Sequence, residues 1–582
     1  HGLVDGHGQL RRVRAARVRR RVRRLDDGAQ RTAEEVRSKG AEVHVRRLDL
    51  GDFGREVGRG VARWFRRVGT FLRQRPRMIR RSIAPRRDWQ ALVEAELWAA
   101  TAAVRAGFDY PAEELEEIWH IVLLQQFHDI LPGSSIAWVN QEAIAEFTAI
   151  RAELDQLMND AWQALSQTGG EERAGLSLVN PSQTDRRDVV TVDGRPTLVQ
   201  VPAMAAEPLT DAVVEPEHSV HSQSGRKTIR MTNGLVEVCI GASDGLVNSI
   251  VDLVAGREVL LPGQCANRLV LHPDHPDCFD AWELQRQYRH SADPVDEVAD
   301  LSVVEDPLRS TVRIERCAEN SNFIQTVTLN ADSRAVEFSL DIDWAERARV
   351  LKVDFPLDVA ARTSIDEIQF GHIERPIGAN TSWDDAHFES CGQRWMLLGE
   401  PGYAIALVNQ SNYGHDVNPA GGDDHTPPGG VMARLTLLRS PQSPDPHPDR
   451  GRHHLVYSLL VDADIASAHV EAARLNQPLE VRDGALRLRS LAGIESVRGM
   501  AVIDAVKQAF DGSGDLVVRL HEADGGRSRV RLLLDRGGKP TEVDLLEEPV
   551  SEPTQQLPVR IASEIDIVLR PFQIMTLRVS QR

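Results

Sequence analysis

The sequence lacks long hydrophobic runs. None of its 582 residues belongs to an apolar stretch near the roughly 18 residues that a membrane helix requires, so we expect no membrane partner. The first residues, His1 to Asp5, offer neither a charged and apolar secretory signal nor an initiator Met. This beginning favours an interior start of the chain.

Cysteine is also scarce. The five cysteines are odd in number, lie far apart and show no Cys-x-x-Cys spacing, which argues against a disulfide framework and against a structural zinc ribbon. They are Cys239, Cys265, Cys278, Cys317 and Cys391. Reduced thiols are the simpler interpretation, and they favour a cytoplasmic location.

Lysine is almost missing from the first 90 residues, where it accounts for one of 26 basic residues. These 26 face 10 acidic residues, whereas the rest of the chain has 43 basic against 76 acidic residues. Positions 11–24 alone hold nine arginines. Two different compositions are therefore joined, and the formal net charge of −17 hides the boundary.

Two interpretations of this basic segment stay open. Clustered guanidinium groups can neutralise phosphates, so the segment could bind nucleic acid or an anionic membrane. No groove-reading motif accompanies the charge, and GC-rich DNA read in the wrong frame also encodes many arginines. We favour this second interpretation, a misread or truncated coding segment, and expect no nucleic-acid partner. Residues 1–88 are then an Arg-rich remnant, frame-shifted or disordered, with at most short helices such as 31–39.

A chain of 64.7 kDa exceeds the about 250 to 300 residues at which single cores stop growing, so two or more domains are expected. Apolar spacing predicts a helix over 88–106 that ends near Gly107 and a second helix that starts near Pro111. The second helix has Leu115, Ile118, Val122 and Gln125 on one stripe, and its far end is predicted to carry His128 and Asp129.

A third helix is expected after the break at Pro132-Gly133. Ser134 or Ser135 can cap it, and a near-heptad stripe continues to about residue 166. The stripe contains Phe147, Ile150, Leu154, Leu157, Ala161 and Leu165. We therefore predict a three-helix bundle in a middle domain spanning 89–168.

His128 has two interpretations. A histidine at a helix end more often caps or packs than binds a metal, because it can satisfy the last carbonyls. However, residues 123–136, LLQQFHDILPGSSI, resemble glycoside hydrolase family 38 α-mannosidases of the bacterial and cytosolic branch. Residues 94–99, EAELWA, resemble the start of that family's helical middle domain.

The resemblance implies a role for each member of the pair. In the family, the histidine matching His128 is one ligand of a catalytic Zn²⁺, and the aspartate matching Asp129 contacts a sugar hydroxyl. Imidazole is a preferred zinc ligand, and a carboxylate accepts hydrogen bonds from hydroxyls. The implied cofactor is Zn²⁺, and the implied partner is a mannose-containing oligosaccharide. A homo-oligomer stays open.

After Gly169-Gly170 the pattern changes to short β-branched runs, which predict C-terminal β-sandwich domains over 169–582. Turn signals occur at Asn233-Gly234, Asp244-Gly245 and Asp483-Gly484. Residues 335–343 alternate with Val336, Phe338, Leu340 and Ile342 inward, and strands are expected within 567–579. The predicted fold class is multidomain α+β, with a three-helix bundle followed by a large β-sandwich region.

Several β segments resemble the same family, and together with the helices they cover the chain from about residue 89 to its end. They lie at 233–260, 267–283, 372–376, 380–384, 400–403, 412–416 and 437–441. Within 277–283, aromatic rings stand beside carboxylates, a composition suited to a sugar-binding wall. We predict that Asp280 and Trp282 bind substrate; the loop 444–449 is a weaker candidate. Trp383 and Trp395 could be inter-sheet core.

The remaining catalytic residues are missing. A retaining glycosidase needs two carboxyl groups about 5 to 5.5 Å apart, and the family's N-terminal α/β domain supplies both, together with a His-x-Asp zinc pair. None of these motifs is found. Asp52, in a sequence resembling an Asp-x-Phe-Gly strand end, lacks the surrounding pattern, so the nucleophile and acid stay unknown. We expect an incomplete or inactive α-mannosidase; the alternative is a non-catalytic carbohydrate-binding or assembly fragment.

Overall fold

The computed structural model describes residues 85–167, 174–378, 380–410, 412–420 and 429–580, with side chains from residue 89 onward. The predictions for 1–84, including the basic segment, helix 31–39 and Asp52, lie outside these residues. None of the helices among these residues combines the length and the apolar character that a membrane-spanning helix requires. The five cysteines are free thiols.

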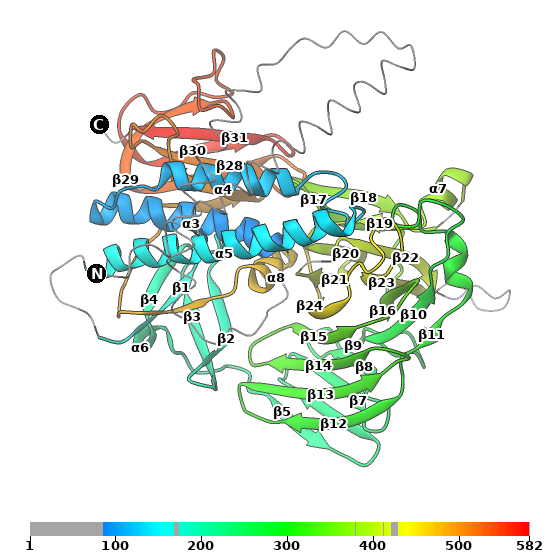
Figure 1. Cartoon of the computed structure of the whole chain (residues 1–582). Helices are drawn as coiled ribbons and strands as arrows, with labels where there is room; N and C mark the ends of the chain where they lie inside the picture. The colour runs from blue at the N-terminus through cyan, green and yellow to red at the C-terminus, as the bar shows by residue number, and fades with distance from the viewer. Residues whose placement is uncertain (1–84, 168–173, 379, 411, 421–428, 581–582) are drawn as a thin grey trace, which may run out of the picture. The chain divides into compact units, whose positions relative to one another are not determined.

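Three helices begin the described chain and pack against one another (Figure 1). They are α3 (Pro85–Ala106), α4 (Ala112–Gln125) and α5 (Ala137–Ser166). The predicted stripe of α4 is buried, and so are Phe147, Ile150 and Leu154 of α5. Leu92 of α3 shares one core with the apolar residues of the α4 stripe and with Ile150 and Leu154 of α5. The three-helix prediction is confirmed because the spacing of apolar residues records which face of each helix is covered.

The end of the second helix differs from the prediction. Helix α4 ends at Gln125, so His128 and Asp129 lie in the turn that follows and not on the helix itself. The amides of Gln126 and Phe127 bond the carbonyls three residues earlier, which tightens the last turn. Ser134 and Ser135 do not cap α5, whose N-cap residue is Ile136.

The β-rich region, as far as the structure describes it, consists of antiparallel sheets. The nine-stranded sheet contains, in spatial order, β12 (Val298–Val304), β13 (Arg309–Cys317), β14 (Asn322–Asn330), β15 (Ala335–Trp344), β24 (Gly451–Val461), β21 (Tyr403–Asn409), β20 (Trp395–Glu400), β17 (Thr363–Ile368) and β18 (Gly371–Pro376). The central six-stranded sheet contains β11 (Asp293–Pro294), β10 (Arg268–Pro273), β16 (Arg349–Leu357), β23 (Gly430–Arg439), β22 (Gly414–Ala420) and β19 (Ser390–Cys391).

Smaller sheets flank these two. The five-stranded sheet contains β5 (His221–Ser224), β6 (Thr228–Thr232), β7 (Val236–Gly241), β8 (Val247–Asp252) and β9 (Arg257–Glu258). β25 (Glu480–Asp483), β1 (Leu176–Asn180) and β4 (Ala205–Pro208) form another, and β2 (Arg186–Val192) pairs with β3 (Arg195–Val201). The C-terminal sheet contains β26 (Ala492–Arg498), β29 (Ser528–Val543), β31 (Ile574–Ser580), β28 (Leu516–Glu522) and β27 (Ala501–Gln508), with β30 (Ala562–Leu569) paired to β29.

Two large cores hold these layers together. The nine-, central six- and five-stranded sheets share one core, in which Phe338, Phe355 and Tyr457 make ring contacts. Val336, Phe338, Leu340 and Ile342 of β15 all point into it, which confirms the alternation read from the sequence. The helical region is followed by antiparallel β-sheets, as predicted.

The second core joins the helices to the C-terminal sheet. Leu97 and Trp98 of α3 and Trp162 of α5 belong to the same apolar cluster as Val518 and Ile567 of that sheet. Trp98 and Trp162 meet edge to face, with ring centroids 6.1 Å apart. Residues far apart in the sequence therefore fix the helical region against the C-terminal strands.

The two tryptophans treated as core candidates behave differently. Trp395 is buried between the nine-stranded sheet and α8 (Ile465–Asn476). Trp383 is 78% exposed on the short helix α7 (Ser382–Ala386), so the core interpretation is wrong for this residue.

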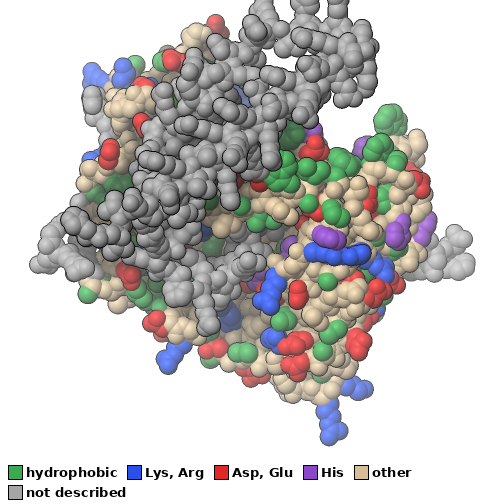
Figure 2. Space-filling view, viewed as in Figure 1, with side chains coloured by type: hydrophobic (Ala, Val, Ile, Leu, Met, Phe, Trp, Pro, Cys, Tyr) green, Lys and Arg blue, Asp and Glu red, His purple; other side chains and the backbone are tan. Residues whose placement is uncertain are grey.

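Figure 2 shows one face of the molecule. Acidic and basic side chains are interspersed on the lower part of this face, and hydrophobic side chains gather at the upper right, in the region where α4 ends in Figure 1.

Candidate functional site

His128 lies at the tip of the connection between α4 and α5. Its side chain is 78% exposed, and its Nε2 lies 3.5 Å from Oδ2 of Asp129. The ring contacts that of Phe127 at a centroid distance of 4.2 Å. Such exposure excludes a packed core histidine, and it leaves the ring open to a ligand arriving from outside the described residues.

Asp129 is held much more firmly than its neighbour. Ser134 Oγ donates to its Oδ1 at 3.1 Å, and Ser135 Oγ donates to its backbone carbonyl at 2.6 Å. Trp282 Nε1, from the β region, donates to the same Oδ1 at 3.2 Å. These bonds fix the carboxylate plane and leave Oδ2 on the side of His128.

The turn that carries Trp282 is built around Arg439, the last residue of β23. The Arg439 guanidinium pairs with the buried carboxylate of Asp274 at 2.7 Å. It also donates to the backbone carbonyls of Asp280, at 2.7 Å, and of Ala281 and Glu283. Burial raises the pKa of Asp274, against the opposing effect of Arg439. One side chain therefore fixes the turn that presents the indole to Asp129.

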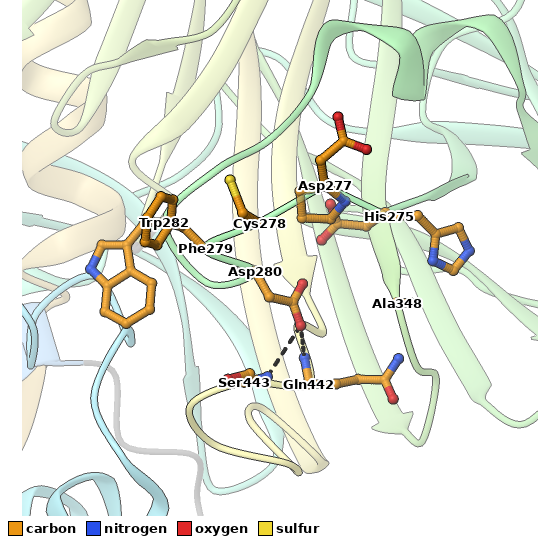
Figure 3. A pocket seen from close by; sticks show the side chains of 11 residues that line it. His275, Asp277, Cys278, Phe279, Asp280, Trp282, Ala348, Gln442 and Ser443 are labelled. Atoms are coloured by element: carbon orange, nitrogen blue, oxygen red, sulfur yellow. Dashed lines mark hydrogen bonds between the residues drawn. The ribbon is translucent and has the colours of Figure 1, made fainter.

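Asp280 has a different environment from the one expected of a sugar ligand. Its Oδ2 accepts the backbone amides of Gln442, at 2.5 Å, and Ser443, at 3.1 Å. Figure 3 shows the Asp280 carboxylate directed at these two amides. One oxygen is thus used to tie the turn to the 442–443 loop. The predicted substrate contact of Asp280 stays a prediction.

A second bond connects the helices to the same loop. Asn140 of α5 donates to Oδ2 of the buried Asp445 at 3.0 Å. The other Asp445 oxygen accepts the amide of His447 at 2.9 Å. The 444–449 loop, a weaker sequence candidate, therefore supports the turn between α4 and α5 from the side.

A pocket of about 440 Å³ opens beside this arrangement. Its wall includes His275, Asp277, Phe279, Trp282 and Gln442. Figure 3 shows His275, Asp277, Phe279 and Trp282 along one loop, with Trp282 and Phe279 at one end, and Gln442 on a second loop. Trp282 is 55% exposed, so it offers ring surface to the pocket while its N–H serves Asp129.

The described residues do not fit a complete zinc site. A catalytic zinc normally takes three or more protein ligands. Among the residues that the structure describes, no group of three His, Cys, Asp or Glu side chains is placed to hold a metal ion. His128 and Asp129 supply donors of the right kind, but only as part of a site.

The sequence predicts substrate contacts for Asp129 and Trp282, and the structure brings the two side chains together through a hydrogen bond that the sequence does not predict. The sequence offers Ser134 or Ser135 as a cap of the next helix, whereas in the structure both hydroxyls bond Asp129. In the sequence, Arg439 belongs to the segment 437–441 that resembles the family, and no role is predicted for it there. In the structure it holds the turn that carries Trp282. A basic residue ending a buried strand was the available signal for Arg439; its partner could not be read from spacing.

Protein-family models match most of this architecture. The α-mannosidase middle domain model matches residues 84–165, which contain the three helices and His128. The glycosyl hydrolase family 38 C-terminal domain matches 231–447, and that family's C-terminal β-sandwich domain matches 500–577. All three models describe parts of glycoside-cleaving enzymes, which defines the class. The chain belongs to glycosyl hydrolase family 38, and the matches cover the family's middle and C-terminal domains.

Individual proteins agree with this assignment. α-Mannosidase 2C1 of Homo sapiens is 32% identical over 514 residues, which cover 84% of the chain and 47% of that protein. An α-mannosidase of Saccharomyces cerevisiae is 27% identical, with coverage of 81% and 44%. The chain therefore spans about half the length of the curated relatives that it matches.

Solved structures share the fold. A family 38 glycosyl hydrolase of Enterococcus faecalis superposes with a TM-score of 0.66 at 16% identity, covering 85% of the chain and 69% of that structure. An α-mannosidase structure from Enterococcus faecalis V583 gives a TM-score of 0.64, also at 16% identity, with coverage of 85% and 66%. At this identity the likeness concerns the arrangement of helices and sheets.

Proposed function

We propose that the chain is the sugar-holding part of an α-mannosidase, and that it binds α-mannosides without hydrolysing them by itself. The full enzyme would cleave α-mannosidic bonds of oligosaccharides with retention, using Zn²⁺ and residues of a catalytic domain. The observation that carries this is the Asp129 carboxylate, fixed by Ser134 and by Trp282 beside an exposed His128.

Each residue has a distinct part in the proposal. Asp129 accepts a hydrogen bond from a sugar hydroxyl, and Trp282 covers an apolar face of the ring. His128 contributes one nitrogen to a zinc site whose other ligands come from the catalytic domain. Relatives at about 30% identity that are named α-mannosidases support the substrate class.

Hydrolysis is tested with the purified chain, a chromogenic α-mannoside and added Zn²⁺. We expect no release of product above the buffer rate, because the retaining mechanism needs two carboxyl groups about 5 to 5.5 Å apart, and no such pair is assigned within the part of the chain that the structure describes. Turnover by the wild type that disappears in His128→Ala would contradict this proposal.

Sugar binding is tested separately, by calorimetric or NMR titration with methyl α-D-mannoside. We expect millimolar binding that Asp129→Ala removes. Asp300→Ala, which alters an exposed carboxylate on β12, is the matched control and should bind as the wild type does. If neither the wild type nor Asp300→Ala binds the mannoside, the carbohydrate-binding role is wrong, and the alternative of an assembly fragment remains.

A further inference from the structure

The hairpin formed by β17 and β18 packs against the C-terminal sheet. At its tip, the ring of Phe370 meets that of His521 on β28 at a centroid distance of 5.6 Å. On β18, the ring of His372 meets that of Phe572, which precedes β31, at 5.1 Å. A Cβ atom at Gly525 would lie 3.2 Å from the His372 ring. The nine-stranded sheet and the C-terminal sheet therefore meet through close ring contacts, with a histidine on each side.

A third histidine lies behind this contact. His469 of α8 is buried, and its ring packs against that of Trp395 of β20 at a centroid distance of 5.3 Å. The ring of His372 lies 6.3 Å from the same indole. Three buried nitrogens in this region, His372 Nδ1, His469 Nε2 and Trp395 Nε1, have no hydrogen-bond partner among the residues that the structure describes. We call His372, His469 and His521 the histidine joint.

Glu367 of β17 and Arg394, directly before β20, face the joint from the nine-stranded sheet. Glu367 is buried, and its Oε1 lies 3.8 Å from His469 Nδ1. The same carboxylate accepts the Arg394 amide at 2.8 Å and the Arg394 guanidinium at 3.0 Å. Because Arg394 already neutralises Glu367, this carboxylate compensates little of a positive charge on His469. Burial lowers the pKa of His469; Glu367 opposes this shift, whereas Arg394 and the other two histidines add to it.

Asp504 and Glu522 face the joint from the C-terminal sheet. Asp504 of β27 lies 2.9 Å from His521 Nδ1, so this histidine has a carboxylate partner in place. Glu522 is buried, and its Oε2 accepts the amides of Gly525 and Phe572, at 3.0 and 2.9 Å. These bonds fix the two loops against which the hairpin packs. The Glu522 carboxylate is therefore occupied by backbone amides.

We propose that the histidine joint is an acid-sensitive contact, which holds the β17–β18 hairpin on the C-terminal sheet at neutral pH and releases it in mildly acidic solution. Protonation of His372 and His469 would place two positive charges beside one buried indole, close to the Arg394 guanidinium. A buried charge without a partner of its own is costly, and opening the joint removes that cost because water reaches the rings. This device acts on the contact between two sheets and is independent of sugar binding.

The opening is local. The second core joins the C-terminal sheet to α3 and α5 through apolar side chains such as Trp98, Trp162 and Val518, and the packing of these side chains does not change with protonation. Acid therefore loosens the hairpin and the loops that it contacts, at residues 365–376 and 521–526, before it loosens either large core.

The direction of the pH effect follows from His469. Its pKa is about 4 in the closed joint, and the ring regains the ordinary pKa of 6.5 when the joint opens. The open state therefore binds a proton at pH values at which the closed state does not. The joint is most stable above pH 6.5, and its stability falls as the pH is lowered toward 4. At pH 5 the opening equilibrium is about 30-fold more favourable than at pH 7.5.

Hydrogen exchange of the full chain at pH 7.5, 6 and 5, corrected for the chemical pH dependence of exchange, tests the proposal. We expect residues 365–376 and 521–526 to lose about 30-fold in protection between pH 7.5 and 5. β15, in the large core, should change less than about twofold. Equal corrected protection of the joint at both pH values would overturn the proposal. An equal loss in β15 would also overturn it, because the chain would then be unfolding as a whole.

Variants assign the response to the histidines. His469→Gln should reduce the 30-fold loss to less than about threefold, and the double variant with His372→Gln to less than about twofold. If His469→Gln does not fold, His372→Gln, at a less buried position, should still reduce the loss at least about twofold. His120→Gln, at an exposed position on α4, is the control and should keep the full response. A pH response that survives the histidine variants would overturn the proposal and leave the proposed function intact.

Discussion

Charged side chains have opposite environments in two regions of the molecule. One is the Asp129 corner, which consists of His128, Asp129, Ser134, Ser135 and Trp282; the other is the buried ion cluster of the central six-stranded sheet. In the cluster, Lys352 of β16 is fully buried, and its ammonium bonds Asp416 at 2.6 Å and Glu389 at 2.8 Å. Arg434 donates to the other Asp416 oxygen at 2.7 Å. At the corner, His128 is 78% exposed, and its ring lies beside a single carboxylate.

The two regions differ in whether the described side chains pair with one another: the ions of the cluster do, whereas the His128 ring stays exposed. A buried charge without an oppositely charged partner strongly destabilises the folded state. Lys352 and Asp416 can be buried because the chain itself supplies their partners. An exposed imidazole carries no such cost, so folding does not require a partner for His128.

The largest effect is expected from Asp416→Asn. The change leaves the buried Lys352 and the partly exposed Arg434 with one negative charge fewer, and breaking such a cluster costs about 3 to 5 kcal/mol of unfolding free energy. Burial alone would raise the pKa of Asp416, but Lys352 and Arg434 outweigh it and lower that pKa. The stabilisation is therefore present above the ordinary pKa of an aspartate and is lost as the pH falls from there through the folded-state pKa of about 2.

Urea unfolding at pH 7 measures this cost. Asp566→Asn is the matched control, because Asp566 pairs with Arg529 and Arg531 at 3.8 and 3.4 Å on the exposed surface. An exposed pair contributes about 0 to 1 kcal/mol. Equal losses for both variants would mean that burial does not distinguish the cluster.

The next effect concerns His469 on α8, which is buried like the cluster but incompletely paired. Its Nε2 has no hydrogen-bond partner among the described residues. Burial lowers the pKa of His469 to about 4, although Glu367 opposes the shift. In the unfolded chain His469 binds a proton below about pH 6.5, whereas in the folded chain it stays neutral down to about pH 4. The unfolding free energy is therefore highest above pH 6.5 and falls as the pH is lowered toward 4.

His469→Gln should flatten this part of the pH profile. The full difference corresponds to roughly 3 kcal/mol between pH 7.5 and 4. Urea unfolding at pH 7.5, 6 and 5 gives the slope for wild type and variant. The exposed His120 of α4 provides the control as His120→Gln, whose profile should follow that of the wild type. Parallel profiles for wild type and His469→Gln would contradict the assignment.

Much of the fold could be predicted because periodicity records burial locally. The α4 stripe from Leu115 to Gln125 and the alternation of β15 both follow from neighbours in sequence. Asn233-Gly234 and Asp483-Gly484 mark turns because these glycines adopt positive φ. The end of α4 was misplaced because three-residue bonds after Leu123 end the helix before His128.

The site could be predicted only in part, because its contacts span the sequence. Trp282 reaches Asp129 across 153 positions, and Asn140 reaches Asp445 across 305. No spacing rule states that an indole of the β region bonds a carboxylate of the helices. Family-like residues indicated the members of the corner, whereas tertiary packing determined which of them touch.

A smaller effect is expected when the corner itself is loosened. Trp282→Phe keeps a ring but removes the N–H that bonds Asp129, and a single hydrogen bond of this kind contributes about 0.5 to 1.5 kcal/mol. The loss should show as faster hydrogen exchange of residues 127–135, with little change in the C-terminal sheet. Trp383→Phe, on the exposed α7, should leave exchange at 127–135 unchanged.

The smallest effect, and the one that best separates the two regions, is expected from His128→Ala. Because the ring is 78% exposed and lies outside the cores, its removal should change the unfolding free energy by less than about 0.5 kcal/mol. Urea unfolding with and without Zn²⁺ measures this. A large loss without metal would place His128 among the residues that folding requires, as Asp416 is. A negligible loss is the expected result if His128 acts by binding a ligand whose other partners lie beyond the residues that the structure describes.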